Sequence, residues 1–226
     1  MNEVGMDSVK RQANRREVLV GIGAAAALLA LPEAATAAEP GLDAARRLLR
    51  LASNRAFAKL SAPNGFWDSP VARFDLPELF VRGASPVPAA SREQLQRRLN
   101  TVAEAGARRA GQAARGTSGL IKKDDAAAIL HGEPTSGTSL LRSRIGARLI
   151  NVMIPAIERA LLAERDPVVM AAVRRLSGVE LTDVAKAIAL KADSAIWYQI
   201  GSEEGDIRRN PQATGDRVLI GAFAAA

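Results

Sequence analysis

The chain has 226 residues, a formal net charge of +7 and no cysteine, which excludes disulfides and thiol chemistry. Its single histidine, His131, argues against a Ser-His-Asp triad and against a multi-histidine metal site. The positive charges spread along the sequence instead of forming one block, which is typical of a solvated surface. We therefore expect no nucleic-acid partner, no metal and no cofactor.

The first 37 residues have the pattern of an export signal. Arg15 and Arg16 precede a weakly apolar stretch, and the stretch ends in an A-x-A cleavage pattern at residues 35–37. The stretch is shorter than the ~20 apolar residues of a membrane-spanning helix. The arginine pair followed by x-Val-Leu resembles the twin-arginine consensus, and an ordinary Sec signal is the alternative.

This pattern predicts a twin-arginine-type signal peptide over residues 1–37 that is cleaved before Ala38. The expected partners are the twin-arginine export machinery and signal peptidase, and the expected location is the periplasm. Residues 38–226 then form the mature domain.

The apolar period of the mature domain is helical almost throughout. A first helix is predicted over residues 42–60, ending at the turn signal Pro63-Asn64-Gly65. Residues 63–90 are the least helical part. A second helix is expected to start at a capping box formed by Ser91 and Gln94, and its small residues would let a neighbouring helix approach closely.

The second half of the chain predicts further helices. Asp124 is expected to cap a short helix over residues 126–130, with His131 at its C-terminal end. Thr138 or Ser139 then opens a long helix through residue 161, in which Pro155 is expected to cause a kink.

Three more helices complete the prediction. The first begins at the N-cap and proline pair Asp166-Pro167, the next starts at Thr182, and the last is short and covers residues 214–223. No segment shows convincing strand alternation. The sequence therefore predicts an all-α fold, a single compact bundle of about six to eight helices.

Seven local patterns occur along the mature chain in a fixed order. They are Asn64-Gly65-Phe66-Trp67, Val71-Ala72-Arg73-Phe74-Asp75-Leu76-Pro77, Leu99-Asn100-x-x-Ala103-Glu104, Asp125-Ala126-x-x-Ile129-Leu130-x-Gly132, Thr138, Glu203-Glu204-x-x-Ile207-Arg208-x-Asn210-Pro211 and Gly221-x-Phe223. As an ordered set, from about Leu42 to Phe223, they resemble the bacterial exported family called domain of unknown function 4197.

The resemblance implies an all-helical secreted or periplasmic domain and implies no established activity. The chain departs from the family pattern around Thr138. Leu140 and Leu141 stand where the family usually has Tyr-Phe, and Ser136-Gly137 stands in place of Ala-Ala. These departures put an aromatic-lined pocket at that point in doubt.

Six polar residues are candidates for binding or structural roles: Asn100, Glu104, Asp125, Thr138, Glu204 and Arg208. Glu204 and Arg208 lie four residues apart on one helix, so they can pair across a turn. Asn100 and Glu104, also four apart, are expected to brace the loop around Gly65-Phe66 or to line a pocket. Asp125 and Thr138 most simply cap helices.

Three functions stay open. The first is a non-enzymatic periplasmic binding or envelope-associated module. The second is a carboxylate-based enzyme that uses Glu104 with Glu203 or Glu204 for general acid–base work. The third is electrostatic attachment to an anionic membrane or wall polymer through the arginine faces at residues 46–50 and 142–148. The lack of H-E-x-x-H, G-x-S-x-G and phosphate-loop motifs favours a non-enzymatic role.

Overall fold

The computed structural model describes residues 40–82 and 85–224, all within one compact unit. Regular structure in these residues consists of nine α-helices and three 3-10 helices, without strands. The all-α class is therefore confirmed. The predicted signal peptide, with Arg15, Arg16 and the cut before Ala38, lies outside the described residues.

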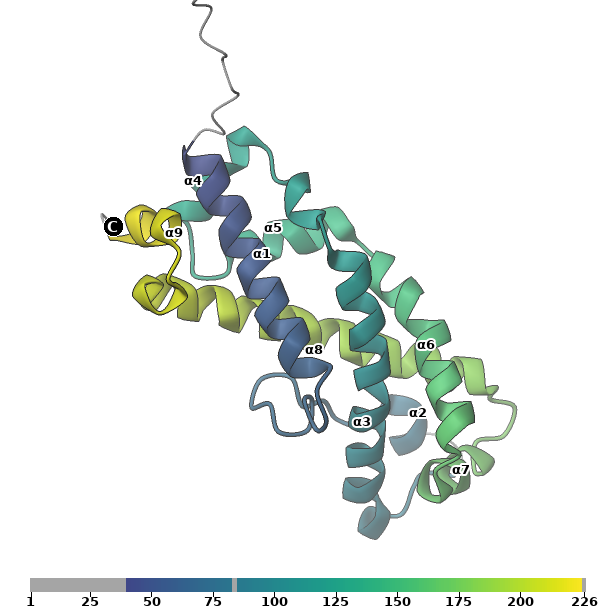
Figure 1. The fold of residues 1–226 in the computed structure, drawn as a ribbon. Coiled ribbons are helices and arrows are strands. Elements are labelled where there is room, and N and C mark those ends of the chain that lie inside the picture. Colours follow the sequence, from purple (N-terminus) through teal and green to yellow (C-terminus); the bar gives the residue numbers. More distant parts are fainter. Residues whose placement is uncertain (1–39, 83–84, 225–226) are drawn as a thin grey trace, which may run out of the picture. The chain divides into compact units, whose positions relative to one another are not determined.

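Four long helices form the body of the fold. They are α1 (Pro40–Leu60), α3 (Ala89–Ala114), α6 (Arg148–Glu164) and α8 (Leu181–Arg209). Figure 1 shows α1, α3 and α6 side by side, with α8 running across them. Because α8 contacts all three, it buries side chains on several sides, and its buried positions include both apolar and charged residues.

Shorter elements connect and cover the long helices. The short α-helices are α2 (Glu78–Val81), α4 (Ala126–Leu130), α5 (Ser136–Ile145), α7 (Pro167–Arg174) and α9 (Arg217–Phe223), and the 3-10 helices span Thr117–Leu120, Lys123–Asp125 and Pro211–Thr214. None of the helices in residues 40–82 and 85–224 is long and apolar enough to cross a membrane.

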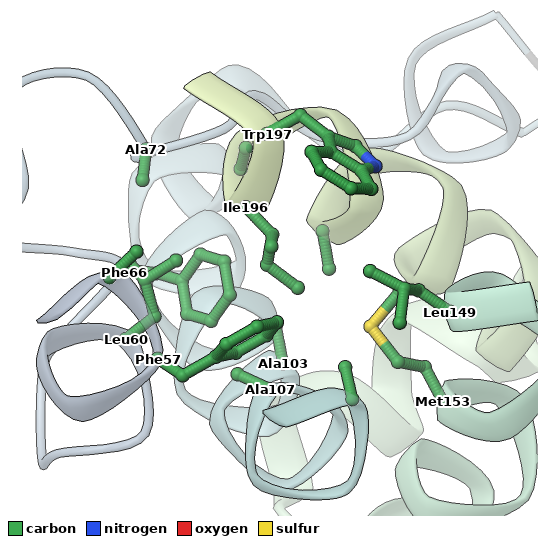
Figure 2. Close-up of a cluster of buried hydrophobic side chains, with 14 of the residues drawn as sticks. Phe57, Leu60, Phe66, Ala72, Ala103, Ala107, Leu149, Met153, Ile196 and Trp197 are labelled. Atoms are coloured by element: carbon green, nitrogen blue, oxygen red, sulfur yellow. The ribbon is translucent and has the colours of Figure 1, made fainter. Parts of the chain in front are cut away.

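The hydrophobic core lies where the long helices meet. Figure 2 shows side chains from α1, α3, α6 and α8 together with Phe66 and Ala72 from the segment after α1. Small residues let the helices approach closely, as predicted for α3. A Cβ added to Gly106 would lie 2.9 Å from Cδ1 of Ile157 on α6.

Of two predicted helix starts, one is confirmed by its cap and the other is wrong. Asp166 accepts the backbone N–H groups of Val168 and Val169, so it is the N-cap of α7 as predicted. The capping box of Ser91 and Gln94 is wrong. Helix α3 already begins at Ala89, after Pro88, and its start has no side-chain cap.

The predicted long helix from Thr138 is also wrong as one element. It is divided into α5 and α6 at Gly146, whose φ of 56° lies in the left-handed region that favours glycine. Helix α6 continues through Pro155. Before α4, Asp125 and not Asp124 accepts a backbone N–H, that of Lys122 at 2.6 Å.

Candidate functional site

Glu204 is fully buried on α8 and caps the N-terminus of α5. Its carboxylate accepts the backbone N–H of Gly137 at 3.1 Å and of Thr138 at 2.7 Å, and the Thr138 hydroxyl at 2.6 Å. The first-turn N–H groups of a helix need such acceptors and favour negative charge. Thr138, predicted as a helix cap, lies inside α5, and Glu204 supplies the capping group.

Arg208 completes this arrangement from one turn further along α8. Its Nη2 and Nε donate to Glu204 Oε1 at 2.6 and 3.2 Å, which is the predicted i, i+4 pair. The guanidinium also donates to the carbonyls of Ile129 and Leu130 at the end of α4. Glu204 and Arg208 therefore fix the α4–α5 corner, defined here as residues 126–145, to α8.

Gly137 is required by the close approach of Glu204. A Cβ at this position would lie 2.9 Å from Glu204 Oε1 and 2.9 Å from Cδ2 of Leu49 on α1. Any larger side chain would separate the carboxylate from the donors that it binds. The Ser136-Gly137 departure from the family pattern thus lies at a crowded point of the corner.

Asn100 braces the segment that follows α1. Its Oδ1 accepts the Phe74 N–H at 3.2 Å, and its Nδ2 donates to the Phe74 carbonyl at 3.0 Å. The Phe74 ring packs edge-on against Phe66, with 5.8 Å between the ring centroids. Asn100 therefore holds the Phe74 backbone, and the Phe74 ring in turn packs against Phe66.

Glu104 lies one turn beyond Asn100, and only 6% of its surface is exposed. Its buried Oε1 has no hydrogen-bond partner in the described part of the chain. Burial raises the pKa of Glu104, while the backbone amides of Asn64 and Gly65 and the charge of Arg108 act in the opposite direction. The ionised form of Glu104 therefore lowers the stability of the folded state.

Glu203 is buried on α8 with partners different from those of Glu204. Its Oε1 lies 2.5 Å from Lys59 Nζ and accepts Gln199 Nε2 at 3.0 Å. Gln199 in turn accepts the Ser69 hydroxyl at 2.8 Å. Glu203 therefore connects α8 to the end of α1 and to the segment after it.

Asp125 is part of a structural ion pair. Arg144 donates to both of its carboxylate oxygens, at 2.6 and 2.7 Å, and this hydrogen bonding lowers the pKa of Asp125. Two other arginines of the predicted attachment faces also bind groups within the fold. Arg46 donates to the Ile121 carbonyl. Arg47 pairs with Asp43 on its own helix, α1, and with Asp216, the N-cap residue of α9.

A hollow of about 680 Å³ lies between α5 and α8. Trp197, Tyr198 and Val71 give it apolar surface, and Arg142 and Arg209 give it charge. Tyr198 is 66% exposed and Val71 42%, and they are two of the five exposed large hydrophobic side chains in the described residues. We call this space the α5–α8 hollow.

Sequence reasoning missed this hollow. Val71, in the segment after α1, has its side chain exposed at the rim. A signal was present on α8, where Tyr198, Gly201 and Gly205 follow one another at helical spacing and all line the hollow. The two glycines are buried and leave room for the side chains of Thr135 and Arg209 beside the aromatic ring.

A protein-family model matches residues 35–224. The chain belongs to the family described as Protein of unknown function (DUF4197). This finding confirms the resemblance seen in the sequence. No curated protein and no solved structure gives a significant match. For this DUF4197 protein, the function must be argued from the geometry of its own residues.

The structure brings three of the six candidate residues of this DUF4197 chain together. Thr138, Glu204 and Arg208 meet at the α4–α5 corner, and Thr138 also lines the α5–α8 hollow. Asn100 and Glu104 lie elsewhere, on α3, and Asp125 lies just before α4, where it pairs with Arg144 of α5. In the described residues, no three His, Cys, Asp or Glu side chains form a group suited to a metal ion.

Proposed function

We propose that the protein is a non-enzymatic binding module of the periplasm whose ligand occupies the α5–α8 hollow. Ligand sites have volumes of about 300–1,000 Å³ and combine apolar walls with a few polar groups. The hollow, of about 680 Å³, falls in this range. Its lining combines five hydroxyl side chains and two guanidinium groups with apolar and aromatic surface.

The exposure of Tyr198 carries the proposal. A ring that is 66% exposed beside a second apolar side chain loses water contact when a ligand covers it, which favours binding. The wall opposite this ring belongs to α5, whose N-terminus is fixed by Glu204. A wall that is already fixed loses little freedom on binding, and this adds to affinity.

The contacts of the acidic residues favour binding over catalysis. Glu203 and Glu204 each serve a set of internal donors, and Glu104 lies on a different helix with its own neighbours. None of the three lines the α5–α8 hollow. A general acid–base pair needs two groups that are free to act on the same substrate, and Glu203 and Glu204 are already engaged by internal donors.

A substitution that fills the hollow tests the proposal. Ser202 lines the hollow from α8, so Ser202→Phe should block it, whereas Asn151→Phe adds the same ring at an exposed site on α6. We expect native mass spectrometry of the protein purified from the periplasm to show a bound small molecule in the wild type and in Asn151→Phe.

Ser202→Phe should lose this molecule while its circular dichroism stays helical. A thermal-shift panel of metabolites and lipids provides the second readout, with stabilisation expected for the wild type and not for Ser202→Phe. If neither method distinguishes Ser202→Phe from Asn151→Phe, the hollow is not a binding site.

The periplasmic location is proposed from residues 1–37 alone. Changing Arg15-Arg16 to Lys-Lys should abolish export if the twin-arginine route is used. The measurement is the amount of mature protein in the periplasmic fraction of cells that express each form. Unchanged export would indicate the Sec route, and a protein that stays in the cytoplasm in both forms would contradict the location.

A further inference from the structure

The charges around the α5–α8 hollow indicate which class of ligand it accepts. Of the described residues that line it, Arg142 and Arg209 are charged and none is a carboxylate. The partner of Arg142 is Asp193, which is buried on α8, and the partner of Arg209 is the exposed Asp206. The hollow itself therefore presents positive charge.

Arg142 contacts a buried carboxylate of α8 that does not line the hollow. Its Nη2 lies 3.4 Å from Asp193 Oδ2, and the other oxygen of Asp193 accepts Trp197 Nε1 at 3.1 Å. Burial raises the pKa of Asp193, and the charge of Arg142 opposes this rise. A guanidinium carries five N–H donors in a fixed fork, and the contact with Asp193 uses only one edge of it. Its other donors remain available to a ligand.

The N-terminus of α5 is not available to an anion. Glu204 already binds the N–H groups of Gly137 and Thr138 there. An anionic group that enters the hollow must therefore be held by side chains. The exposed hydroxyl of Ser139 lies on α5 one turn before Arg142, and both line the hollow.

The positions along α8 give the length of the hollow. Asp193 and Asp206, the partners of the two arginines, lie about 20 Å apart at 1.5 Å per helical residue. Between them Trp197, Tyr198, Ser202 and two buried glycines form the floor of the hollow, and among these Tyr198 is the exposed apolar side chain. One end of this floor carries Arg142, which contacts the buried Asp193, and the other carries Arg209 in an exposed pair.

We propose that the ligand is an elongated anionic amphiphile, with a carboxylate or phosphate headgroup bound by Arg142 and Ser139 and an apolar chain lying along Tyr198 and Val71. This inference rests on the proposed function of the hollow. The headgroup binds the arginine fork through charge-assisted hydrogen bonds. The chain covers the exposed aromatic ring of Tyr198.

Four compounds with the same twelve-carbon chain test the ligand class. Laurate and dodecyl phosphate carry anionic headgroups, dodecanol is neutral, and dodecyltrimethylammonium is cationic. Titration calorimetry below the micelle concentrations should show at least tenfold tighter binding of one or both anions than of dodecanol, and no binding of the cation. A stronger response to laurate or to dodecyl phosphate identifies the headgroup.

Three variants locate the headgroup. Arg142→Gln should weaken binding of the preferred anion at least tenfold and leave dodecanol unchanged. Arg148→Gln, which removes an exposed arginine outside the hollow, is the matched control and should change neither. Since Arg142→Gln leaves Asp193 without its cation and can lower stability, Ser139→Asp provides an independent test. It places negative charge at the same point and should weaken only the anions.

The outcomes separate this inference from the proposed function. Equal binding of laurate, dodecyl phosphate and dodecanol, abolished by Ser202→Phe, overturns the anionic class and leaves the hollow as a binding site. A ligand in the native mass spectrum combined with no binding of any dodecyl compound overturns the amphiphile. Unchanged anion binding in both Arg142→Gln and Ser139→Asp overturns the assignment of the headgroup.

Discussion

Glu204 and Glu104 are both buried glutamates, and their surroundings differ sharply. Glu204 binds two backbone N–H groups, one hydroxyl and the Arg208 guanidinium. Glu104 has a buried oxygen without a hydrogen-bond partner in the described residues, and burial raises its pKa. Glu203 is intermediate, with one lysine and one amide as partners.

This difference teaches that a buried acidic side chain is not by itself a sign of catalysis. What it does for the fold depends on how many donors meet it, because the loss of hydration must be compensated within the protein. At the α4–α5 corner the compensation is complete, and the charge joins three helices. Beside the turn after α1 it is incomplete, and the charge weakens the fold.

The largest effect is expected at Glu204. Glu204→Gln removes a charge from a site built of donors and leaves Arg208 buried without its carboxylate, so we expect a loss of about 3–5 kcal/mol in the free energy of unfolding. Urea denaturation measures it. A loss below about 1 kcal/mol would show that the corner is held by packing instead.

A smaller effect is expected at Lys59, whose side chain is 60% exposed beside Glu203. Lys59→Met should lower the free energy of unfolding by about 1 kcal/mol, since exposure weakens the pair and Gln199 continues to donate to Glu203. The control is Lys186→Met, because Lys186 pairs with the exposed Asp183 and should matter less. Equal effects of the two variants would contradict the intermediate position of Glu203.

Substitution of Glu104 is expected to stabilise the protein, in contrast to substitution of Glu204 or Lys59. Because its pKa is raised in the folded state, the folded chain binds this proton more tightly than the unfolded chain, and stability falls as pH rises above the ordinary value of 4.5. Glu104→Gln removes this loss and should raise the free energy of unfolding at pH 7.

The gain at Glu104 should disappear below about pH 4, where the carboxyl is protonated in both states. Urea denaturation at several pH values measures this dependence. A Glu104→Gln protein that is less stable than the wild type at pH 7 would show that the ionised carboxylate is compensated after all.

Local features of the fold could be predicted from the sequence, and distant contacts could not. The i, i+4 spacing predicts the Glu204–Arg208 pair, and Asp166-Pro167 predicts the start of α7, because both depend on residues within one turn. The donors of Glu204 at residues 137 and 138 lie more than sixty positions away, and no local pattern connects them.

The candidate site shows the same limit. The hollow depends on how α5 packs against α8, and the sequence predicts one continuous helix across the break at Gly146 that ends α5. Tyr198 lies on a helix in which the neighbouring residue, Trp197, is buried, so its exposure depends on which face α5 leaves uncovered. Helical periodicity alone does not give this face.

The most direct test concerns the connection between the corner and the hollow. Arg208→Lys keeps the charge beside Glu204 and removes the forked donors that bind the carbonyls at the end of α4. Amide hydrogen exchange of residues 134–142 and ligand retention in native mass spectra are measured on the same protein. The account predicts faster exchange in this segment together with loss of the bound molecule. Faster exchange with the ligand fully retained would contradict it, because the corner would then not shape the site.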